Sequence, residues 1–519
     1  MLNSKKIFTL LGLNLKGGSM GNQLSNLLCF ILGPILLTIL PAIAISETLS
    51  LSLTDAITTA LKENKIINYY YIGKEIADRR VDFEKAIYIP NLNLMGLTER
   101  YGWDSLTLNN YHKRIVDSYQ VSLSQKNSLG GTSSINFSTD RDSYIFNIPR
   151  IYEKEYTSSI FLKYEQPLLK GFGQNMTNLN IDKAKINKEL AFQKFEDMKS
   201  NILYNVFRDY FLLYRATEEL RLAREIRKNT EEIYNIVKEK VEMRRLSMTD
   251  LHKMEAWLHI QDKEILELEF KRWQRQNQLL LSIYNEARGG SIKKIFLLNT
   301  PDEVIRNYKE PPLSETKMKT ENNDFELLQY KNDLKLYEKD MQKALNDFKP
   351  DLTLSMELGA EGYDFNRRSK SISDINPDNY RVILQGILSL PIINTSAKSK
   401  WLEVKGQIEQ THIQISNRRN LIENSVNELY NDLEMVRKKG ELNERIVALS
   451  KRNLENEIEK LVREKSTVLN TLDYQANLSN AELDMLATKI DYMLILGTSY
   501  LYRREMEVFT NGLKGSQMK

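Results

Sequence analysis

The sequence predicts an α+β protein with an internal duplication, in which very long antiparallel α-helices are joined to amphipathic β-strands. Two observations lead to this prediction. Proline is absent between Pro167 and Pro301 and again after Pro391, so each half contains a stretch in which a long helix can run uninterrupted. The two halves also match in spacing, because 83 residues separate Pro167 from Asp250 and 82 separate Pro391 from Asp473.

The first predicted element is a helix over residues 51–87. We expect Thr54 and Asp55 to cap it, because short oxygen-bearing side chains accept hydrogen bonds from the free amides at a helix start. This helix stops before Pro90 in the segment IPNLNL, and a matching helix stops before Pro350 in KPDLTL. Proline disfavours the helical conformation in the residue before it, so both prolines mark the change from helix to strand.

Beyond these prolines, apolar and polar residues alternate, as in strands with two different faces. The alternating runs lie near residues 91–94, 119–124, 134–138, 160–164, 352–358 and 380–388. The prolines that bound the strands are 77 residues apart in the first half and 41 in the second, and the surplus of 36 residues predicts one extra hairpin around Gly130 and Gly131. The alternation fits strands that cross a bilayer in a barrel, and it fits ordinary half-buried strands nearly as well.

Two rod-like helices are predicted over about residues 178–244 and 396–464, neither of which contains proline. At about 1.5 Å per residue, roughly 67 residues form a rod of about 100 Å. Apolar residues recur at three- and four-residue spacing, for example at Ile422, Val426 and Leu429, which indicates coiled-coil packing against partner helices. Charged residues fill the other positions, so we expect the rods to stand in water. A shorter returning helix is predicted after each rod, near residues 249–284 and 469–502.

The N-terminal region has the composition of a targeting segment. An apolar run from Leu27 to Ile45 follows several lysines and ends in small residues, so residues 1–44 are predicted to be a secretory signal peptide, with a retained helical anchor as the alternative. The one cysteine, Cys29, lies inside this run. Without the three lysines of this segment, 70 basic residues face 69 acidic ones, which gives no support for nucleic-acid binding.

The sequence contains no recognisable pattern of catalytic, cofactor-binding or metal-binding residues. Its four histidines are scattered, and no two of them share one helical face at metal-ligand spacing. Gly171 and Gly173 resemble part of a dinucleotide-binding turn, but Met176 stands where the third glycine belongs. We expect these glycines to redirect the chain from strand to helix. The prediction is therefore a protein that is not an enzyme and that uses no cofactor or metal.

Taken together, these features resemble the TolC family of bacterial outer-membrane efflux proteins. The segment LSLTDAITTALKEN at residues 51–64 resembles the family's first-helix signature. The segment IPNL at residues 89–92 resembles its strand start, and QPLL at residues 166–169 its strand end, with LPI at residues 390–392 as a weaker second copy. The duplicated order covers about residues 51–504, and the resemblance depends on this order more than on any single motif.

The resemblance implies an α+β membrane protein assembled as a homotrimer, with strands forming a β-barrel in outer-membrane lipid and helices forming an α-barrel across the periplasm. Family members contribute four strands each to a twelve-stranded barrel. The extra hairpin departs from that pattern, so the barrel here is either larger or carries the hairpin against its rim. The implied function is a channel-tunnel for efflux or type I secretion, which works with a periplasmic adapter protein and an inner-membrane transporter. The alternative is a periplasmic or surface coiled-coil scaffold without a pore.

The chain is expected to divide into five parts. Residues 1–44 form the signal peptide, and residues 45–300 form a first repeat that contains the extra hairpin. A linker in an equatorial region follows at residues 301–322, and the second repeat occupies residues 323–505. Residues 506–519 are expected to form a flexible tail.

The turns between long and short helices are the periplasmic tips that the resemblance implies, where family members close as an iris and contact the adapter. Candidate adapter contacts are Arg244, Arg245, Leu246, Ser247, Lys465, Ser466 and Thr467. The family's usual tip glycine is replaced by Arg244 and Glu464. Some relatives carry two aspartates, three residues apart, just past the second tip, and here Asn470 and Asp473 occupy these positions.

Only Asp473 therefore matches that pair of aspartates. In a trimer it would form a negative ring that admits cations, and Asp250 is the corresponding gate candidate in the first half. The alternative for Asp473 is an ordinary solvated carboxylate on a helix.

Overall fold

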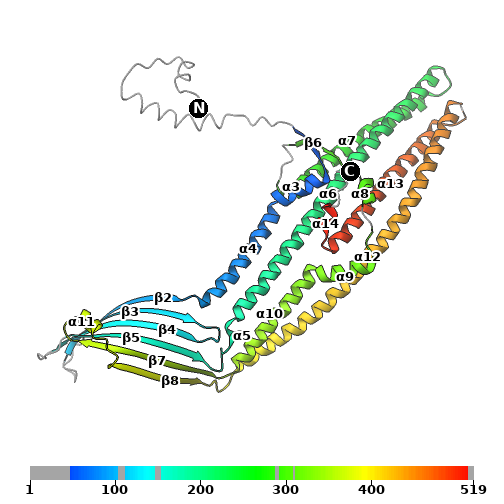
Figure 1. The fold of residues 1–519 in the computed structure, drawn as a ribbon. Helices are drawn as coiled ribbons and strands as arrows, with labels where there is room; N and C mark the ends of the chain where they lie inside the picture. The colour runs from blue at the N-terminus through cyan, green and yellow to red at the C-terminus, as the bar shows by residue number, and fades with distance from the viewer. Residues whose placement is uncertain are drawn as a thin grey trace, which may run out of the picture.

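The computed structural model describes residues 47–102, 111–146, 154–286, 292–307, 310–463 and 465–511. Over these residues the protein is strongly elongated, with a β-sheet at one end and long helices that extend from it to two helical tips (Figure 1). The predicted signal peptide and Glu464 of the second tip lie outside the described residues.

The sheet has six strands in the antiparallel order β2-β3-β4-β5-β7-β8. The strands are β2 (Asn91–Gly102), β3 (Tyr111–Lys126), β4 (Thr132–Phe146), β5 (Lys154–Pro167), β7 (Asp351–Asp364) and β8 (Tyr380–Ser389). The pairing of β5 with β7 joins the two halves of the chain. All six predicted alternating runs are strands, and the surplus hairpin is β3–β4, which lies inside the sheet between β2 and β5.

The two rods are α6 (Leu179–Glu242) and α12 (Thr395–Val462), each about 100 Å long. Each rod has two shorter antiparallel partners in series (Figure 1). Helix α4 (Lys65–Lys85) lies beside α6 near the sheet, and α7 (Met248–Tyr284) lies beside it toward the tip. Helices α10 (Phe325–Asp347) and α13 (Val468–Tyr502) flank α12 in the same way. The repeated order of helix, strands, long helix and returning helix is therefore confirmed.

A small mixed region lies beside the rods at mid-length. It contains the parallel pair β1 (Glu47–Leu51) and β6 (Ile292–Leu297), together with α3 (Leu53–Glu63), α8 (Pro301–Asn307), α9 (Leu313–Asn323) and α14 (Met506–Asn511). The main core is here, where Phe207 and Tyr210 of α6 are fully buried. The Tyr210 hydroxyl donates to the Leu51 carbonyl at 3.1 Å and accepts from the Asn299 amide at 3.1 Å. Burial raises the pKa of Tyr210 to about 12, so this neutral phenol ties α6 to the mixed region.

The prediction of one helix over residues 51–87 is wrong in two details. The helix is broken at Asn64, whose extended backbone ends α3 and whose side chain accepts from the amides of Ile66 and Ile67 to cap α4. The cap of α3 is Ser52, not Thr54 or Asp55, because the Ser52 hydroxyl accepts from the Asp55 amide. Asparagine stabilises a helix start better than a helix interior, which favours the break.

The expected flexible tail is also wrong for its first six residues. Residues Met506–Asn511 form α14, and Met506 and Phe509 are fully buried in the main core. Arg504 makes this packing possible, because its φ of +58° turns the chain back at the end of α13. Residues 512–519 lie outside the described part of the chain.

Candidate functional site

One face of the sheet is apolar and exposed across all six strands. The pairing register places Leu92, Leu123, Ile135, Leu162, Leu358 and Val382 in a single row, one residue from each strand. Each of these side chains is 45–59% exposed. Since alternate residues of a strand share a face, neighbouring rows extend the same surface. We call this surface the apolar face; it comprises Leu92, Leu94, Tyr119, Val121, Leu123, Ile135, Phe137, Ile160, Leu162, Tyr164, Leu354, Met356, Leu358, Val382, Leu384 and Leu388.

Within the rows that form the apolar face, the charged side chains of the described strands project from the opposite face of the sheet. Lys163 of β5 and Glu357 of β7 are register partners there, each between two apolar-face neighbours along its own strand. Lys163 also pairs with Glu165 at 2.7 Å, and Arg381 of β8 pairs with Glu361 at 3.3 Å. Within these rows one side of the sheet therefore carries the charges and the other carries none, whereas further from the helices Asp117 and Arg141 form an ion pair on the same side as the apolar face.

The apolar face has the height of a membrane-spanning band. At about 3.3 Å per residue and a strand tilt of about 40°, the stretch from Tyr380 to Leu388 rises about 20 Å, close to the ~25 Å band of barrel proteins. The band ends where the short helix α11 (Arg368–Ser373) covers the sheet, with Ser158 Oγ 2.8 Å from Ser371 Oγ. Exposed apolar surface on this scale is typical of an interaction with lipid or with another protein.

The link from β5 to α6 redirects the chain from the sheet into the helices. Gly171 and Gly173 have φ of +79° and +97°, which other residues adopt only with strain. The Leu168 amide donates to the Leu352 carbonyl at 2.7 Å, and the Gly173 amide donates to the Leu129 carbonyl at 3.0 Å. These bonds fix the link to β7 and to the β3–β4 turn. The redirecting role expected for the two glycines is therefore confirmed.

The first tip turns through a left-handed residue. Arg244 has a φ of +60°, the conformation in which glycine is favoured, at the position where the resemblance implies a glycine. The Arg245 amide donates to the Lys240 carbonyl at 2.8 Å and the Arg244 amide to the Val241 carbonyl at 2.9 Å, which is the Schellman pattern that ends many helices. At the second tip, the Lys465 amide makes the same type of bond to the Lys460 carbonyl at 2.8 Å.

Two of the gate candidates are located where the returning helices begin. The Ser247 hydroxyl caps α7 by accepting from the Asp250 amide at 3.2 Å, and it donates to the Asp250 carboxylate at 2.8 Å. Thr467 caps α13 in the same way by accepting from the Asn470 amide at 3.2 Å. Asp250 and Asn470 are thus equivalent first-turn residues of the two repeats. Besides being a gate candidate, Asp250 takes part in the capping of α7. Asp473 is exposed one turn further along α13.

The adapter-contact candidates separate into outward and inward groups. Arg244, Arg245 and Lys465 are exposed at the ends of the hairpins. Leu246 packs against the apolar cluster described below, and Ser466 donates a hydrogen bond to the buried Glu457. The hydrogen bonds from Ser466 and then Lys460 hold the pKa of Glu457 below its usual value.

The two tips are joined to each other. A buried cluster of Ile233 and Val237 of α6, Met254 of α7, Leu461 of α12, and Val468 and Leu472 of α13 connects the two hairpins. Beside this tip cluster, Lys240 Nζ donates to the carbonyl oxygens of Leu461 at 2.9 Å and Val462 at 3.0 Å. Sequence reasoning did not identify Lys240, since nothing in a single helix indicates which distant helix end its ammonium contacts.

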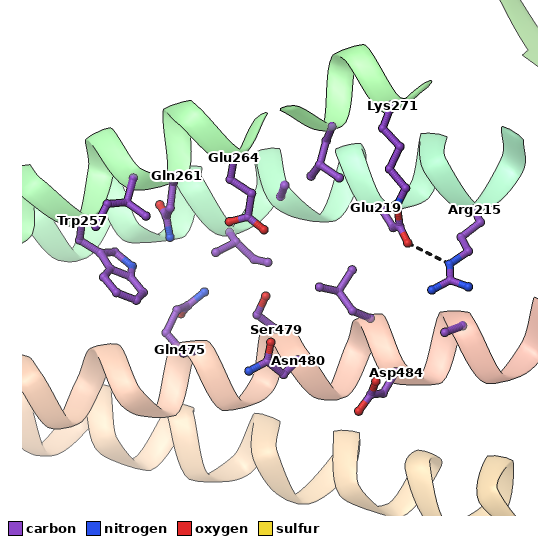
Figure 2. Close-up of a pocket in the computed structure, with 17 residues that line it drawn as sticks. Arg215, Glu219, Trp257, Gln261, Glu264, Lys271, Gln475, Ser479, Asn480 and Asp484 are labelled. Atoms are coloured by element: carbon purple, nitrogen blue, oxygen red, sulfur yellow. Dashed lines mark hydrogen bonds and ion pairs between the residues drawn. The ribbon is translucent and has the colours of Figure 1, made fainter. Parts of the chain in front are cut away.

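A polar cleft separates the hairpins between the tip cluster and the main core (Figure 2). It has a volume of about 510 Å³, and Trp257 and Gln261 of α7 face Gln475 of α13 across it. Trp257 Nε1, Gln261 Oε1 and Gln475 Oε1 are buried with no hydrogen-bond partner among the described residues. No buried apolar cluster of the described residues spans this seam, whereas one lies at each of its ends. At the end of the cleft nearer the main core, Glu219 of α6 pairs with Arg215 at 2.9 Å and with Lys271 at 2.6 Å.

In the described ranges, no group of three or more His, Cys, Asp or Glu side chains is placed to hold a metal ion. None of the helices described is both long and apolar enough to cross a membrane.

Comparison with known proteins identifies the fold. No protein-family model matches the sequence, and no curated protein matches it. Solved structures do match. The outer membrane protein VceC from Vibrio cholerae superposes with a TM-score of 0.62 at 11% identity, covering 87% of this chain and 95% of that one. The open state of the Neisseria gonorrhoeae MtrE outer membrane channel gives 0.60 at 16% identity, with 87% and 88% covered. CusC, studied for its transmembrane channel formation, gives 0.63 at 14% identity, with 88% and 93% covered. This chain therefore has the fold of outer-membrane channels, as the resemblance implied.

Proposed function

We propose that this protein is an outer-membrane channel-tunnel that acts as a passive export duct. Three copies join their sheets into a β-barrel in the outer membrane and their helices into a tube across the periplasm. No catalytic step is part of the proposal. Transport is driven by an inner-membrane transporter that reaches the tube through a periplasmic adapter, in an efflux or type I secretion system.

The observation that carries this proposal is the charge-free apolar face. A single chain in water would expose that face at a large free-energy cost, whereas a bilayer would cover it. The charged face would then line a water-filled lumen, as in other membrane barrels. The similarity to outer-membrane channels supports the same reading.

We further propose that the helical tips form the gate. The tip cluster and Lys240 hold the hairpins together at the end of the tube, while no apolar cluster of the described residues joins the hairpins across the polar cleft behind them. Asp473 is proposed to line the narrowest ring in the trimer, where three carboxylates favour cations. Arg244, Arg245 and Lys465 are exposed at the ends of the hairpins, which suits them to contact an adapter.

The test is electron microscopy of the full-length protein, extracted from membranes with and without detergent. The proposal predicts that detergent is required, and that the particles are hollow and three-fold with a tube about 100 Å long. Recovery of solid rods without detergent would support a coiled-coil scaffold instead. The chain provides a matched control for extraction, since Leu358→Glu places a charge on the apolar face and Gln385→Glu adds the same charge at an exposed position of the opposite face. Only the first should impair insertion.

A further inference from the structure

We propose that three copies close an eighteen-stranded barrel, in which β8 of each copy pairs with β2 of the next and the β3–β4 hairpin is part of the wall. The inference rests on the three-fold channel proposed above and adds the strand count, the interface and the width of the lumen. Four features of the sheet lead to it.

The first feature is the pairing of the hairpin on both sides. Strand β3 pairs with β2 along the whole of Asn91–Gly102, and β4 pairs with β5 from Thr132 to Ser143. If the hairpin lay against the rim of a smaller barrel, β2 would have to pair directly with β5. Both ladders would then be lost, and every freed amide and carbonyl would need a new partner.

The second feature is that the hairpin has the same two faces as the rest of the sheet. Tyr119, Val121 and Leu123 of β3 lie on the apolar face, in register with β2 on one side and β4 on the other. Ser122 and Asn136 are register partners on the opposite face. A hairpin folded against a rim has no need of an apolar band in register with its neighbours, whereas a strand of the barrel wall does.

The third feature is the anchoring of the β3–β4 turn at the helix end of the sheet. Asn127 closes the turn, since its side chain accepts from the amides of Leu129 and Gly131 at 3.0 and 2.8 Å. The Leu129 carbonyl accepts from Gly173 at 3.0 Å and from Gln166 Nε2 at 3.2 Å. The turn is therefore hydrogen-bonded to the link between β5 and α6, at the end of the sheet that faces the helices.

The fourth feature is the pair of free edges. Among the described strands, β2 and β8 each pair on one side only. Leu94 of β2 is 73% exposed and Leu384 of β8 is 72% exposed, the highest values on the apolar face. Because β8 runs toward the helices and β2 runs away from them, β8 of one copy would meet β2 of the next in antiparallel orientation. Open edges of this length invite pairing with another chain, and closure into a barrel removes them.

The geometry of the helices agrees with eighteen strands. With strands about 4.8 Å apart and tilted by about 40°, eighteen strands have a circumference of about 110 Å, and twelve at the same tilt about 75 Å. Each copy brings four helices to the sheet, namely α4, α6, α10 and α12 (Figure 1). Twelve helices at 8–10 Å separation have a circumference of about 96–120 Å. The larger barrel therefore continues the helical tube without narrowing, so that cargo size is limited at the tips.

Disulfide cross-linking tests the interface directly. The full-length chain with Cys29→Ser has no other cysteine. Pairs would combine one substitution to cysteine in β2, at Asn93, Met95 or Leu97, with one in β8, at Ile383, Gln385 or Ile387, all on the face opposite the apolar face. We expect at least one pair to give covalent dimers and trimers on oxidation. The control pair, Ser159→Cys with Glu361→Cys, joins register partners within one chain and should give no dimer.

Microscopy of reconstituted particles tests the strand count. The wild-type barrel should show eighteen strands. Deletion of residues 111–146 removes the hairpin and joins the outer ends of β2 and β5, so the circumference should fall to two-thirds. A hollow three-fold particle with another strand count, or without any β2–β8 cross-link, would overturn this inference alone. Solid or monomeric particles would overturn the proposed function as well. If the deletion variant fails to fold, the wild-type strand count and the β2–β8 cross-links still test the eighteen-stranded barrel.

Discussion

Lys240 Nζ of the first hairpin lies 2.9 Å from the carbonyl oxygen of Leu461 at the end of the second rod. The last carbonyls of a helix have no partners within it, and that end of the helix carries a partial negative charge. An ammonium group placed there satisfies the carbonyls and neutralises the charge. One side chain thus connects the two tips of a copy at the end of the proposed tube.

Replacing Lys240 by methionine should loosen this connection. The variant keeps the length of the apolar stem but loses the charge and its hydrogen bonds, which together are worth about 1–2 kcal/mol. We expect the open probability of single channels in planar bilayers to rise about 5- to 30-fold. The matched control is Lys238→Met, an exposed position on the same helix. Equal behaviour of the two variants would show that Lys240 does not hold the gate.

Arg244→Gly should stabilise the first tip. An L-residue in the left-handed region costs about 1–2 kcal/mol, part of which is offset by the greater freedom of glycine in the unfolded chain. A net gain of about 0.5–1 kcal/mol should slow hydrogen exchange of the Arg245 amide about 2- to 5-fold. Arg244→Ala retains a side chain and should give no such slowing. Faster exchange in the glycine variant would mean that the arginine side chain stabilises the turn.

Asp473→Asn should reduce the preference of the channel for cations. A unit charge about 4 Å from a passing ion is worth about 1 kcal/mol even in water, which corresponds to about 5-fold, so the loss of three charges should lower the cation-to-anion permeability ratio by at least about that factor. Reversal potentials in a salt gradient measure this ratio. The control is Asp491→Asn, an exposed position further along α13. Unchanged selectivity in the Asp473 variant would leave that residue as an ordinary solvated carboxylate.

Two helical glycines should respond to alanine in opposite directions. A methyl group on Gly497 of α13 would lie 2.5 Å from Phe207, a fully buried ring in the main core, so Gly497→Ala should destabilise by about 1–3 kcal/mol. Gly406 of α12 has open space around it, so Gly406→Ala should stabilise by up to about 1 kcal/mol. Thermal unfolding followed by helical circular dichroism compares the stabilities of the two variants. A stabilised Gly497 variant would indicate that Phe207 can move away.

The seam between the hairpins should respond to pH through Glu482 of α13. Burial, and then the nearby Glu225, raise the pKa of Glu482, although Lys451 and Arg221 oppose the shift. A carboxyl whose pKa is raised on folding loses its stabilising contribution as the pH rises through that pKa. Glu482→Gln should therefore raise Tm at pH 7.5, by about 1 °C given the partial exposure of the group.

At pH 4 the advantage of this variant should disappear, because that is below the ordinary pKa of 4.5 and the wild-type carboxyl is largely protonated there. Glu455→Gln, at an exposed position of α12, serves as the control and should change Tm at neither pH. An advantage that persists at pH 4 would show that ionisation of Glu482 is not its cause.

Sequence periodicity predicted the strands and rods well, because each follows from a pattern within one segment. The place of the surplus hairpin in the sequence was predicted, but its place within the sheet was not. Pairing of β3 with β2 and of β4 with β5 depends on register between segments, which no single segment reveals. The same limit applies to the tip, where Lys240 contacts a helix end more than 200 residues away in the sequence. The tail was misjudged because Phe509 finds its partners, Phe207 and Tyr500, only in the folded core.

Cysteine accessibility on β7 distinguishes an apolar face in contact with lipid from one in contact with water. Leu358 and Glu357 are neighbours that project from opposite faces of the same strand. Leu358→Cys and Glu357→Cys would be made separately in the Cys29→Ser background, and each protein reconstituted into vesicles would be treated with a water-soluble maleimide. If lipid covers the apolar face, the cysteine at position 357 reacts with the maleimide and the one at position 358 does not. Rapid reaction at position 358 would mean that water covers the apolar face, and would contradict the membrane barrel.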